Sequence, residues 1–253
     1  MTGFSVFAQK ELLELVRTWR LWVLPGIVLF FALTSPIVAR YTPEILQTLA
    51  AEQLGRFELP TPTYLDAYGG WIKNLSQIVM FALIIVSGGL VSSERRSGTA
   101  VLVLTKPLSR GAFILAKAVV QSMFLVVLVA AGTLITWAAT GAVFGEAPGQ
   151  ALWSASFAWL VFGILIVALM TLLSVIIRPA AGAAGAGLGA YVLLSIVVLW
   201  EPLGTYSPAA LTTAPTSLAM GESVDLFWPV VTALILAAVL TAVAAASFRR
   251  LEL

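Results

Sequence analysis

Residues 147–177 read APGQALWSASFAWLVFGILIVALMTLLSVII and contain no Asp, Glu, Lys or Arg. A helix needs roughly 20 residues to cross the ~30 Å hydrocarbon core of a bilayer, and this run is longer. It is continuously apolar, whereas a strand of a membrane β-barrel would alternate apolar and polar side chains. This stretch therefore predicts a membrane-spanning helix.

Uncharged runs of similar length lie on both sides of this stretch, at 21–39, 74–93, 118–145, 179–200, 202–221 and 226–248. The run 202–221 is the exception, because it holds Pro202, Pro208 and Pro215 among Ser, Thr and Gly. A lipid-exposed helix cannot lose that many backbone hydrogen bonds, so we expect a loop or a re-entrant segment buried in protein. The predicted fold is an all-α polytopic membrane protein. Its six spans are expected at about 21–39, 72–92, 113–138, 152–177, 181–200 and 227–248.

The composition excludes a soluble enzyme, because 60% of the residues are hydrophobic, only 10% are charged and the mean hydropathy is +1.01. Histidine and cysteine are absent, which excludes His-dependent triads and His/Cys zinc sites. No GxxxxGK[ST] phosphate loop occurs, and no charged residue falls at the middle of a predicted span. We therefore expect no catalytic residue, metal site or cofactor in this chain.

The distribution of Lys and Arg predicts the orientation in the membrane. An even number of spans puts both termini on one side, and all but three of the 14 basic residues fall on that side. The exceptions are Arg40, Arg56 and Lys73. Both termini are therefore expected in the cytoplasm. A cleaved signal peptide is not expected, because the leader before residue 21 is long and contains glutamates.

Residues 4–20, FSVFAQKELLELVRTWR, predict an amphipathic helix in the cytoplasmic interface. One side of this helix is apolar: Phe4, Phe7, Ala8, Leu12, Leu15, Val16 and Trp19. The other side is polar: Gln9, Lys10, Glu14, Arg17 and Arg20. Such a helix could serve only as a membrane anchor, or it could be an elbow that also contacts a partner.

The loop between spans two and three, SSERRSGTAVLVLTKPLSRGAFILAK at 92–117, combines charges with an apolar piece. Ser109 is suited to cap the next helix, and Arg110 and Lys117 are expected at the headgroups. The apolar piece 100–104 cannot remain in water. It could dock on a second protein, or it could rest on the bilayer or on the elbow helix.

Two further stretches predict local irregularities. Residues 180–191, AAGAAGAGLGAY, place Gly182, Gly185 and Gly189 at spacings that allow close helix packing, within the chain or across a dimer, or else a hinge. Kinks are expected at Pro36 and at Ser87–Gly89. In the external segment 40–72, Pro43 is expected to begin a short separate helix, with a plain loop as the alternative.

With these motifs together, the chain resembles the membrane subunit of a type-2 ATP-binding-cassette (ABC) exporter across nearly its whole length. The family's elbow pattern K-E-x-x-E-x-x-R is matched by Lys10, Glu11, Glu14 and Arg17. The family's first cytoplasmic loop has an acidic residue, Gly-Thr, an apolar run, K-P-x-S-R and a following Lys. The matching residues are Glu94, Arg95, Arg96, Gly98, Thr99, Val101, Leu102, Leu104, Lys106, Pro107, Ser109, Arg110 and Lys117.

The resemblance implies that residues 93–110 contain a coupling helix that docks in a groove of a separate ATPase subunit. Glu94 and Arg96 would orient the loop, Gly98 would permit its turn, and Thr99 to Leu104 would form the docking surface. Arg110 would secure the start of span three. Expected partners are two ATP-binding subunits that hold ATP and Mg, a second permease subunit as homodimer or heterodimer, and membrane lipids, but no nucleic acid.

Two functions from other classes remain as alternatives. One is a stand-alone channel or lipid-scrambling dimer without an ATPase, and the other is an intramembrane enzyme. The second lacks almost every usual catalytic group. The absence of cysteine, the pI near 9.1 and the Ala/Gly-rich spans suit a bacterial cytoplasmic (inner) membrane.

Overall fold

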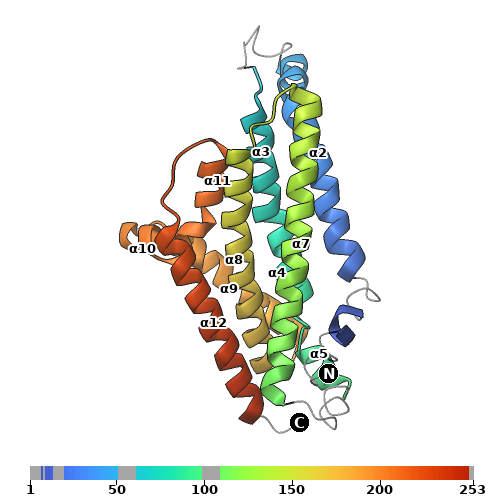
Figure 1. The fold of residues 1–253 in the computed structure, drawn as a ribbon, viewed down its shortest axis with the longest axis vertical. Coiled ribbons are helices and arrows are strands. Elements are labelled where there is room, and N and C mark those ends of the chain that lie inside the picture. The colour runs from blue at the N-terminus through green and yellow to red at the C-terminus, as the bar shows by residue number, and fades with distance from the viewer. Residues whose placement is uncertain (1–6, 8, 14–19, 51–60, 99–108, 251–253) are drawn as a thin grey trace.

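The computed structural model describes residues 7, 9–13, 20–50, 61–98 and 109–250, and all structural statements concern these residues. They form helices joined by turns, with no strand among them, so the expected all-α class is confirmed. The long helices run side by side along one axis (Figure 1). Their bounds are α2 (Arg20–Ala50), α3 (Tyr64–Asn74), α4 (Met80–Ser87), α5 (Ser92–Arg96), α7 (Arg110–Phe144), α8 (Gly149–Ile176), α9 (Ala180–Val197) and α12 (Phe227–Arg250).

Six helices within the described part of the chain are long and apolar enough to cross a membrane, which confirms the expected number of spans. They cover Trp22–Thr48, Tyr64–Arg96, Arg110–Phe144, Gly149–Ile176, Ala180–Val197 and Phe227–Arg250. The chain is therefore a multi-pass membrane protein. Helix α8 lies at its centre, packed against α7, α9, α12 and the short helix α11 (Ala214–Ala219).

The first span is longer than expected, and the prediction of a separate helix starting at Pro43 is wrong. Helix α2 continues through Pro25, Pro36 and Pro43 to Ala50. Hydroxyl groups beside two of these prolines donate to carbonyls one turn earlier: Ser35 to Phe31 at 2.7 Å and Thr42 to Val38 at 2.6 Å. The carbonyls that Pro36 and Pro43 leave without an N–H donor are those of Ala32 and Ala39, so these hydroxyl bonds reach the carbonyl one residue earlier in each turn.

Helices α2 and α7 are too long for the bilayer alone. At 1.5 Å per residue, the 31 residues of α2 span about 46 Å and the 35 residues of α7 about 52 Å, against a hydrocarbon core of ~30 Å. Figure 1 shows their far ends well beyond the start of α12. Both helices are therefore longer than the hydrocarbon core is thick.

The second span is built from α3, a π-helical segment at Leu75–Val79 and α4. In the π segment the Tyr191 hydroxyl of α9 donates to the Ser76 carbonyl at 2.9 Å. The expected irregularity at Ser87–Gly89 is present as the end of α4. A Cβ on Gly88 would lie 2.6 Å from the Ala180 carbonyl oxygen, so glycine allows the start of α9 to approach there.

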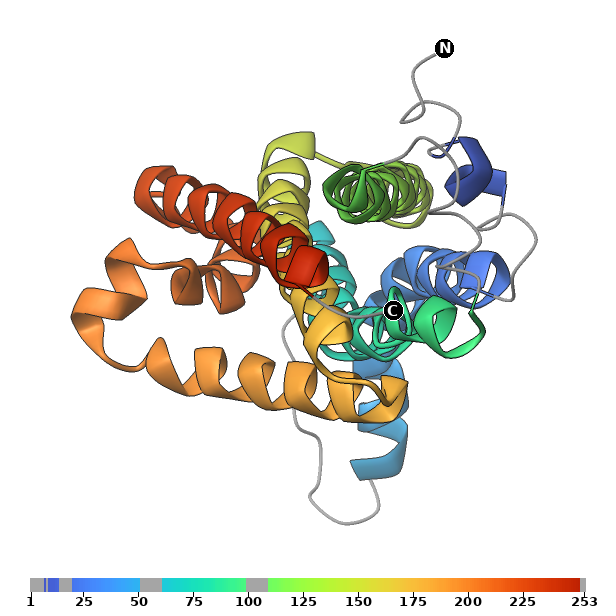
Figure 2. The same cartoon turned by 90° about the horizontal axis from the view of Figure 1, so that it is seen from below.

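The proline-rich segment 202–221 does not span the membrane, as expected. It forms three short helices, α10 (Glu201–Tyr206), η2 (Pro208–Thr212) and α11 (Ala214–Ala219). Each has a proline at its first or second position, where no intrahelical N–H bond is lost. Helix α11 packs on α8 and α3. Figure 2 shows α9 at the opposite edge of the bundle from α7, with α10 leading back toward α12.

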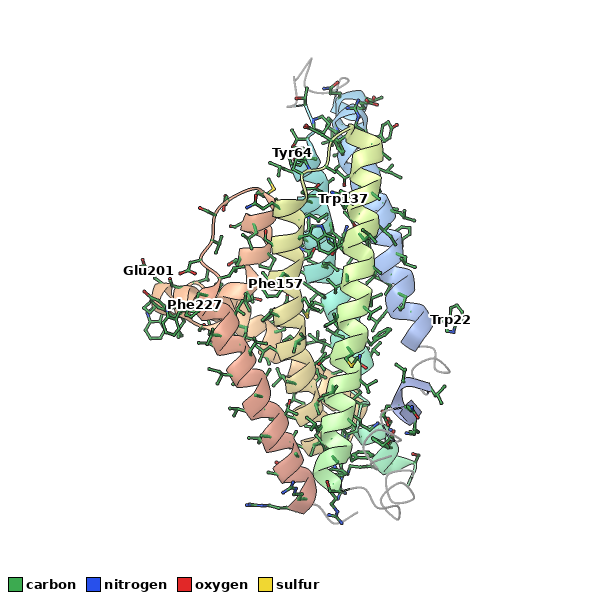
Figure 3. The ribbon with its side chains drawn as sticks, in the orientation of Figure 1. Trp22, Tyr64, Trp137, Phe157, Glu201 and Phe227 are labelled. Atoms are coloured by element: carbon green, nitrogen blue, oxygen red, sulfur yellow. The ribbon has the colours of Figure 1, made fainter. Side chains whose placement is uncertain are left out.

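Aromatic side chains mark two levels along the bundle (Figure 3). Trp22 is 75% exposed and projects from the lower part of α2, whereas Tyr64 and Trp137 lie toward the other end. We call the lower end in Figure 1, which holds α5, the start of α7 and the end of α12, the basic end. Its arginines are Arg95, Arg96, Arg110, Arg178, Arg249 and Arg250.

Candidate functional site

Four charged side chains from three distant segments meet at the basic end, and we call them the charge cluster: Lys10, Glu11, Glu94 and Lys117. The ammonium of Lys117 lies 2.7 Å from Glu94 Oε1 and 2.9 Å from Glu11 Oε2. The ammonium of Lys10 lies 3.2 Å from Glu94 Oε1 and 3.1 Å from Glu11 Oε1. The cluster joins the N-terminal helical segment 9–13, α5 and α7.

Three members of the charge cluster are buried, although all are ionisable, and the side chain of Lys10 is 35% exposed. Lys117 is 3% exposed, Glu94 6% and Glu11 7%. Two ammonium and two carboxylate groups give no net charge, which makes their removal from water tolerable. Glu94 Oε2 has no hydrogen-bond partner among the described residues. Loss of any one partner would leave an uncompensated buried charge.

Aromatic rings enclose the cluster. The rings of Phe7 and Phe113 have centroids 5.1 Å apart, and Phe113 stacks on Phe248 at 5.3 Å. The ammonium of Lys117 lies 5.2 Å from the centroid of Phe113, and that of Lys10 lies 5.3 Å from the centroid of Phe7. Cations at such distances are attracted by the ring faces. The rings also exclude water and so strengthen the ion pairs.

Helix α5 is attached to the end of α8 by hydrogen bonds to a serine side chain of α8. The Ser174 hydroxyl oxygen accepts from the backbone N–H groups of Val91 at 2.8 Å and Ser92 at 3.0 Å. These donors lie at the start of α5, where a helix leaves N–H groups without internal partners. Ser174 therefore fixes the position of α5 on α8.

Two arginines of α5 bind the same end of α8. Arg95 donates to the Val175 carbonyl at 2.7 Å, and Arg96 donates to the Arg178 carbonyl at 3.5 Å. A cation near the C-terminus of a helix is favoured by the helix dipole. The resemblance implies that Glu94 and Arg96 orient the loop, whereas Arg95 makes the shorter of the two arginine contacts.

The described residues on either side of the segment 99–108 have a defined geometry. Gly98 has a φ of +74°, a left-handed conformation that favours glycine, so the expected turn is present. Ser109 caps α7 as expected, because its hydroxyl oxygen accepts from the Ala112 N–H at 3.1 Å. Arg110 donates to the Arg249 carbonyl at 3.1 Å and ties α7 to the end of α12.

Several predicted site residues lie outside the described residues. In the loop these are Thr99, Val101, Leu102, Leu104, Lys106 and Pro107, and in the elbow they are Glu14 and Arg17. Their docking and elbow roles therefore remain predictions.

One expectation about a charged side chain is wrong. Lys117 does not extend to the headgroups, because it points into the protein toward Glu11 and Glu94. The carboxylates within its reach outweigh exposure of the ammonium to water. In the elbow, Leu12 is 56% exposed and Lys10 turns toward Glu94, so the two side chains lie on different sides of the segment.

Gly185 and Gly189 of α9 do not pack within the chain, although close packing there is one of the predicted alternatives. Gly182, Gly185 and Gly189 are exposed, and a Cβ on Gly185 or Gly189 would meet nothing within 4 Å. The close approach occurs at Gly187, where a Cβ would overlap the sulfur of Met170. Packing of the exposed glycines across a dimer stays a prediction.

A second feature lies far from the charge cluster, between α2 and α3. This cavity of about 620 Å³ is lined by apolar side chains and by the polar groups of Thr34, Asp66 and Asn74. Asn74 donates to the Ser35 hydroxyl oxygen at 3.1 Å across the two helices. Among the described residues no group of three or more His, Cys, Asp or Glu could hold a metal ion.

Comparison with known proteins gives two results. The chain is 27% identical over 256 residues to "Uncharacterized transmembrane protein YxlG" from Bacillus subtilis (strain 168), and the alignment covers 100% of this chain and 99% of that protein. The family described as "Protein of unknown function (DUF2705)" matches residues 54–253, which include Glu94 and Lys117 but not the elbow residues. Because this match takes in most of the sequence, the chain belongs to the DUF2705 family.

Proposed function

We propose that the chain is the permease subunit of an ABC exporter, which forms the substrate path as a dimer and is driven by two separate ATP-binding subunits. In this proposal the partner subunits hold ATP and Mg, and this chain performs no chemistry. The observation that supports the proposal most is the charge cluster, because it attaches both the elbow segment and α5 to the start of a spanning helix.

The contacts around the loop 99–108 provide a route for mechanical force. Glu94 links α5 to α7 through Lys117, and Ser174 links α5 to α8. Arg110 then links α7 to α12. An ATPase that moved this loop would therefore displace three spanning helices and the elbow segment together.

A buried ionic cluster is an unusual choice for a plain membrane anchor. A buried ion pair contributes little net stability compared with apolar packing, but it specifies geometry strictly because every partner is required. Transmission of force between an ATPase and the membrane helices needs such a fixed geometry. This requirement favours the permease over a protein whose elbow merely rests on the bilayer.

The proposed orientation places the basic end in the cytoplasm. Arginines of the loop, of the α8–α9 connection and of the end of α12 gather there, as the positive-inside rule requires for a cytoplasmic face. The proposed location is the cytoplasmic membrane of a bacterium. The exposed glycines of α9 are the proposed contact between two copies, since small residues let helix backbones approach closely in lipid.

The docking role of the loop is tested by a double substitution, Leu102→Asp with Leu104→Asp, with Leu102→Ile and Leu104→Ile as the matched control. Tagged protein is purified from its native host in mild detergent, and bound proteins are identified by mass spectrometry. We expect a companion with a Walker-type phosphate loop on the wild type and the isoleucine variant. The aspartate variant should bind it at least a hundredfold more weakly, because each buried leucine contributes roughly 1.5 kcal/mol or more.

Equal amounts of the companion on the aspartate variant would contradict docking through this loop. A chain that retains no ATPase in any form would instead favour a stand-alone channel or scramblase.

A further inference from the structure

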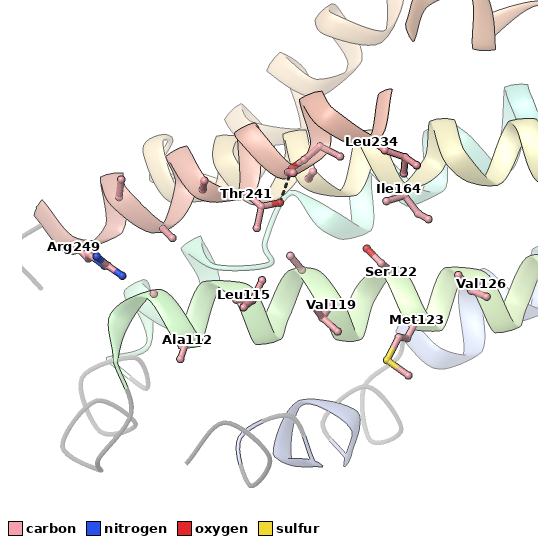
Figure 4. Close-up of a pocket in the computed structure, with 18 residues that line it drawn as sticks. Ala112, Leu115, Val119, Ser122, Met123, Val126, Ile164, Leu234, Thr241 and Arg249 are labelled. Carbon is pink, nitrogen blue, oxygen red and sulfur yellow. Dashed lines mark hydrogen bonds between the residues drawn. The ribbon is translucent and has the colours of Figure 1, made fainter. Parts of the chain in front are cut away.

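A long apolar groove runs between α7 and α12, with α8 as its floor (Figure 4). Its volume is about 870 Å³. Helix α7 contributes Leu115, Val119 and Val126, α8 contributes Ile164, and α12 contributes Leu234. The rest of the α12 wall is mostly alanine, which keeps the groove open along that side.

One charged side chain lines this groove, and it lies at the basic end. The Arg249 guanidinium reaches from α12 toward α7, so that a Cβ on Gly111 would lie 2.7 Å from Arg249 Nη2. Glycine at position 111 therefore makes room for the arginine. No carboxylate among the described residues pairs with Arg249, although its own carbonyl accepts from Arg110.

The groove is long enough to hold one acyl chain. From Gly111 to Val126 it follows α7 for about 22 Å at 1.5 Å per residue, whereas half of the hydrocarbon core is about 15 Å thick. An acyl chain whose headgroup lies at Arg249 therefore fits within the length of the groove.

We propose that this groove binds an anionic phospholipid of the leaflet at the basic end. The acyl chain lies along the groove, and the phosphate of the headgroup pairs with Arg249. The arginine offers planar donors that match a phosphate, and the groove offers the apolar wall. This site does not depend on an ATPase partner, so it goes beyond the proposed function.

A second copy of the chain is a poorer occupant than a lipid. Two copies that packed through the same face would bring two Arg249 side chains toward each other, and like charges directly opposed are destabilising. The groove itself offers no carboxylate to offset them. A phospholipid supplies the missing negative charge and the apolar chain in one molecule.

The proposal is tested by native mass spectrometry of the full chain after delipidation in detergent. Dioleoyl phosphatidylglycerol or dioleoyl phosphatidylcholine is added at equal concentration. The wild type should retain phosphatidylglycerol about fivefold more strongly, the effect of one basic side chain near the membrane surface. Arg249→Gln should abolish this preference. Arg250→Gln removes the same charge one residue along, outside the groove, and should keep it.

A steric pair tests the apolar part of the site. Ala238→Phe fills the groove and should reduce binding of both lipids, whereas Val239→Phe lies on the exposed face outside the groove and should not. Equal effects of Arg249→Gln and Arg250→Gln would overturn the proposal, as would equal binding of the two lipids by the wild type. A loss of dimer in Ala238→Phe, with lipid binding unchanged, would show that the groove is an interface between copies.

Discussion

Lys117 lies two turns into α7, with its ammonium within 3 Å of two carboxylates and away from the water that its long stem could reach. This arrangement decides how the basic end is held together. Glu94 and Glu11 come from different parts of the chain. Among the described residues, the other cation that pairs with both is Lys10, whose side chain is 35% exposed. Lys117 is therefore the central member of the charge cluster.

Removal of this ammonium should be strongly destabilising. Lys117→Met keeps the apolar stem but leaves two buried carboxylates with one shared cation, and we expect a loss of about 3–5 kcal/mol in the free energy of unfolding. The measurement is denaturant unfolding in mild detergent. Lys73→Met, at an exposed position of α3, is the control and should change stability by less than about 1 kcal/mol.

The double variant Glu94→Gln with Lys117→Met removes one charge of each sign. It should recover part of the stability lost in Lys117→Met, because the remaining Lys10–Glu11 pair is neutral. A Lys117→Met protein as stable as Lys73→Met would contradict the structural role of the charge cluster.

For single residues, the sequence predicts which side chains belong to the candidate site but not which of them are in contact. The motifs single out Lys10, Glu11, Glu94 and Lys117. The bond between Lys117 and Glu11 joins positions 106 residues apart, and helical periodicity carries no information on such a contact. The anchoring hydroxyl of Ser174 is not predicted either, since a serine inside an apolar run gives no local signal of its partner.

At the scale of elements, the uncharged runs predict six spanning helices correctly but not their ends. Helix α2 continues through Arg40 and Glu44, and α7 begins at Arg110 before Lys117, so charged residues lie inside both helices and do not mark their ends. The short helices α10, η2 and α11 follow the prolines of 202–221, a segment that the sequence places outside the set of spans. The π segment of span two has no counterpart in the hydrophobic pattern.

One face of helix α9 is exposed and contacts no other helix among the described residues. Gly185 and Gly189 lie on an exposed face, with Leu193 and Ile196 continuing it toward the far end. If this face joins two copies, Gly185→Leu with Gly189→Leu should weaken the dimer about tenfold through overpacking. Analytical ultracentrifugation in detergent measures the dissociation constant.

Gly26→Leu is the matched control for this substitution. Gly26 is also an exposed helix glycine, at which an added Cβ would meet nothing within 4 Å, but it lies on α2. A control that weakens the dimer as much as the α9 variant would exclude α9 as the specific contact.

At the scale of the whole molecule, three features lie at one end: the charge cluster, the fixed ends of the loop 99–108, and the mouth of the groove at Arg249. The opposite ends of α2 and α7 extend past the other helices (Figure 1). This asymmetry suits a protein that receives force on one face of the membrane.

The most direct test of the proposed permease is the mass of the intact complex purified from the native host in mild detergent, with nucleotide present. We predict two copies of this chain together with two copies of a subunit that carries a Walker-type phosphate loop. A complex that contains only this chain, in the presence and absence of nucleotide, would contradict the account and favour a stand-alone channel or scramblase.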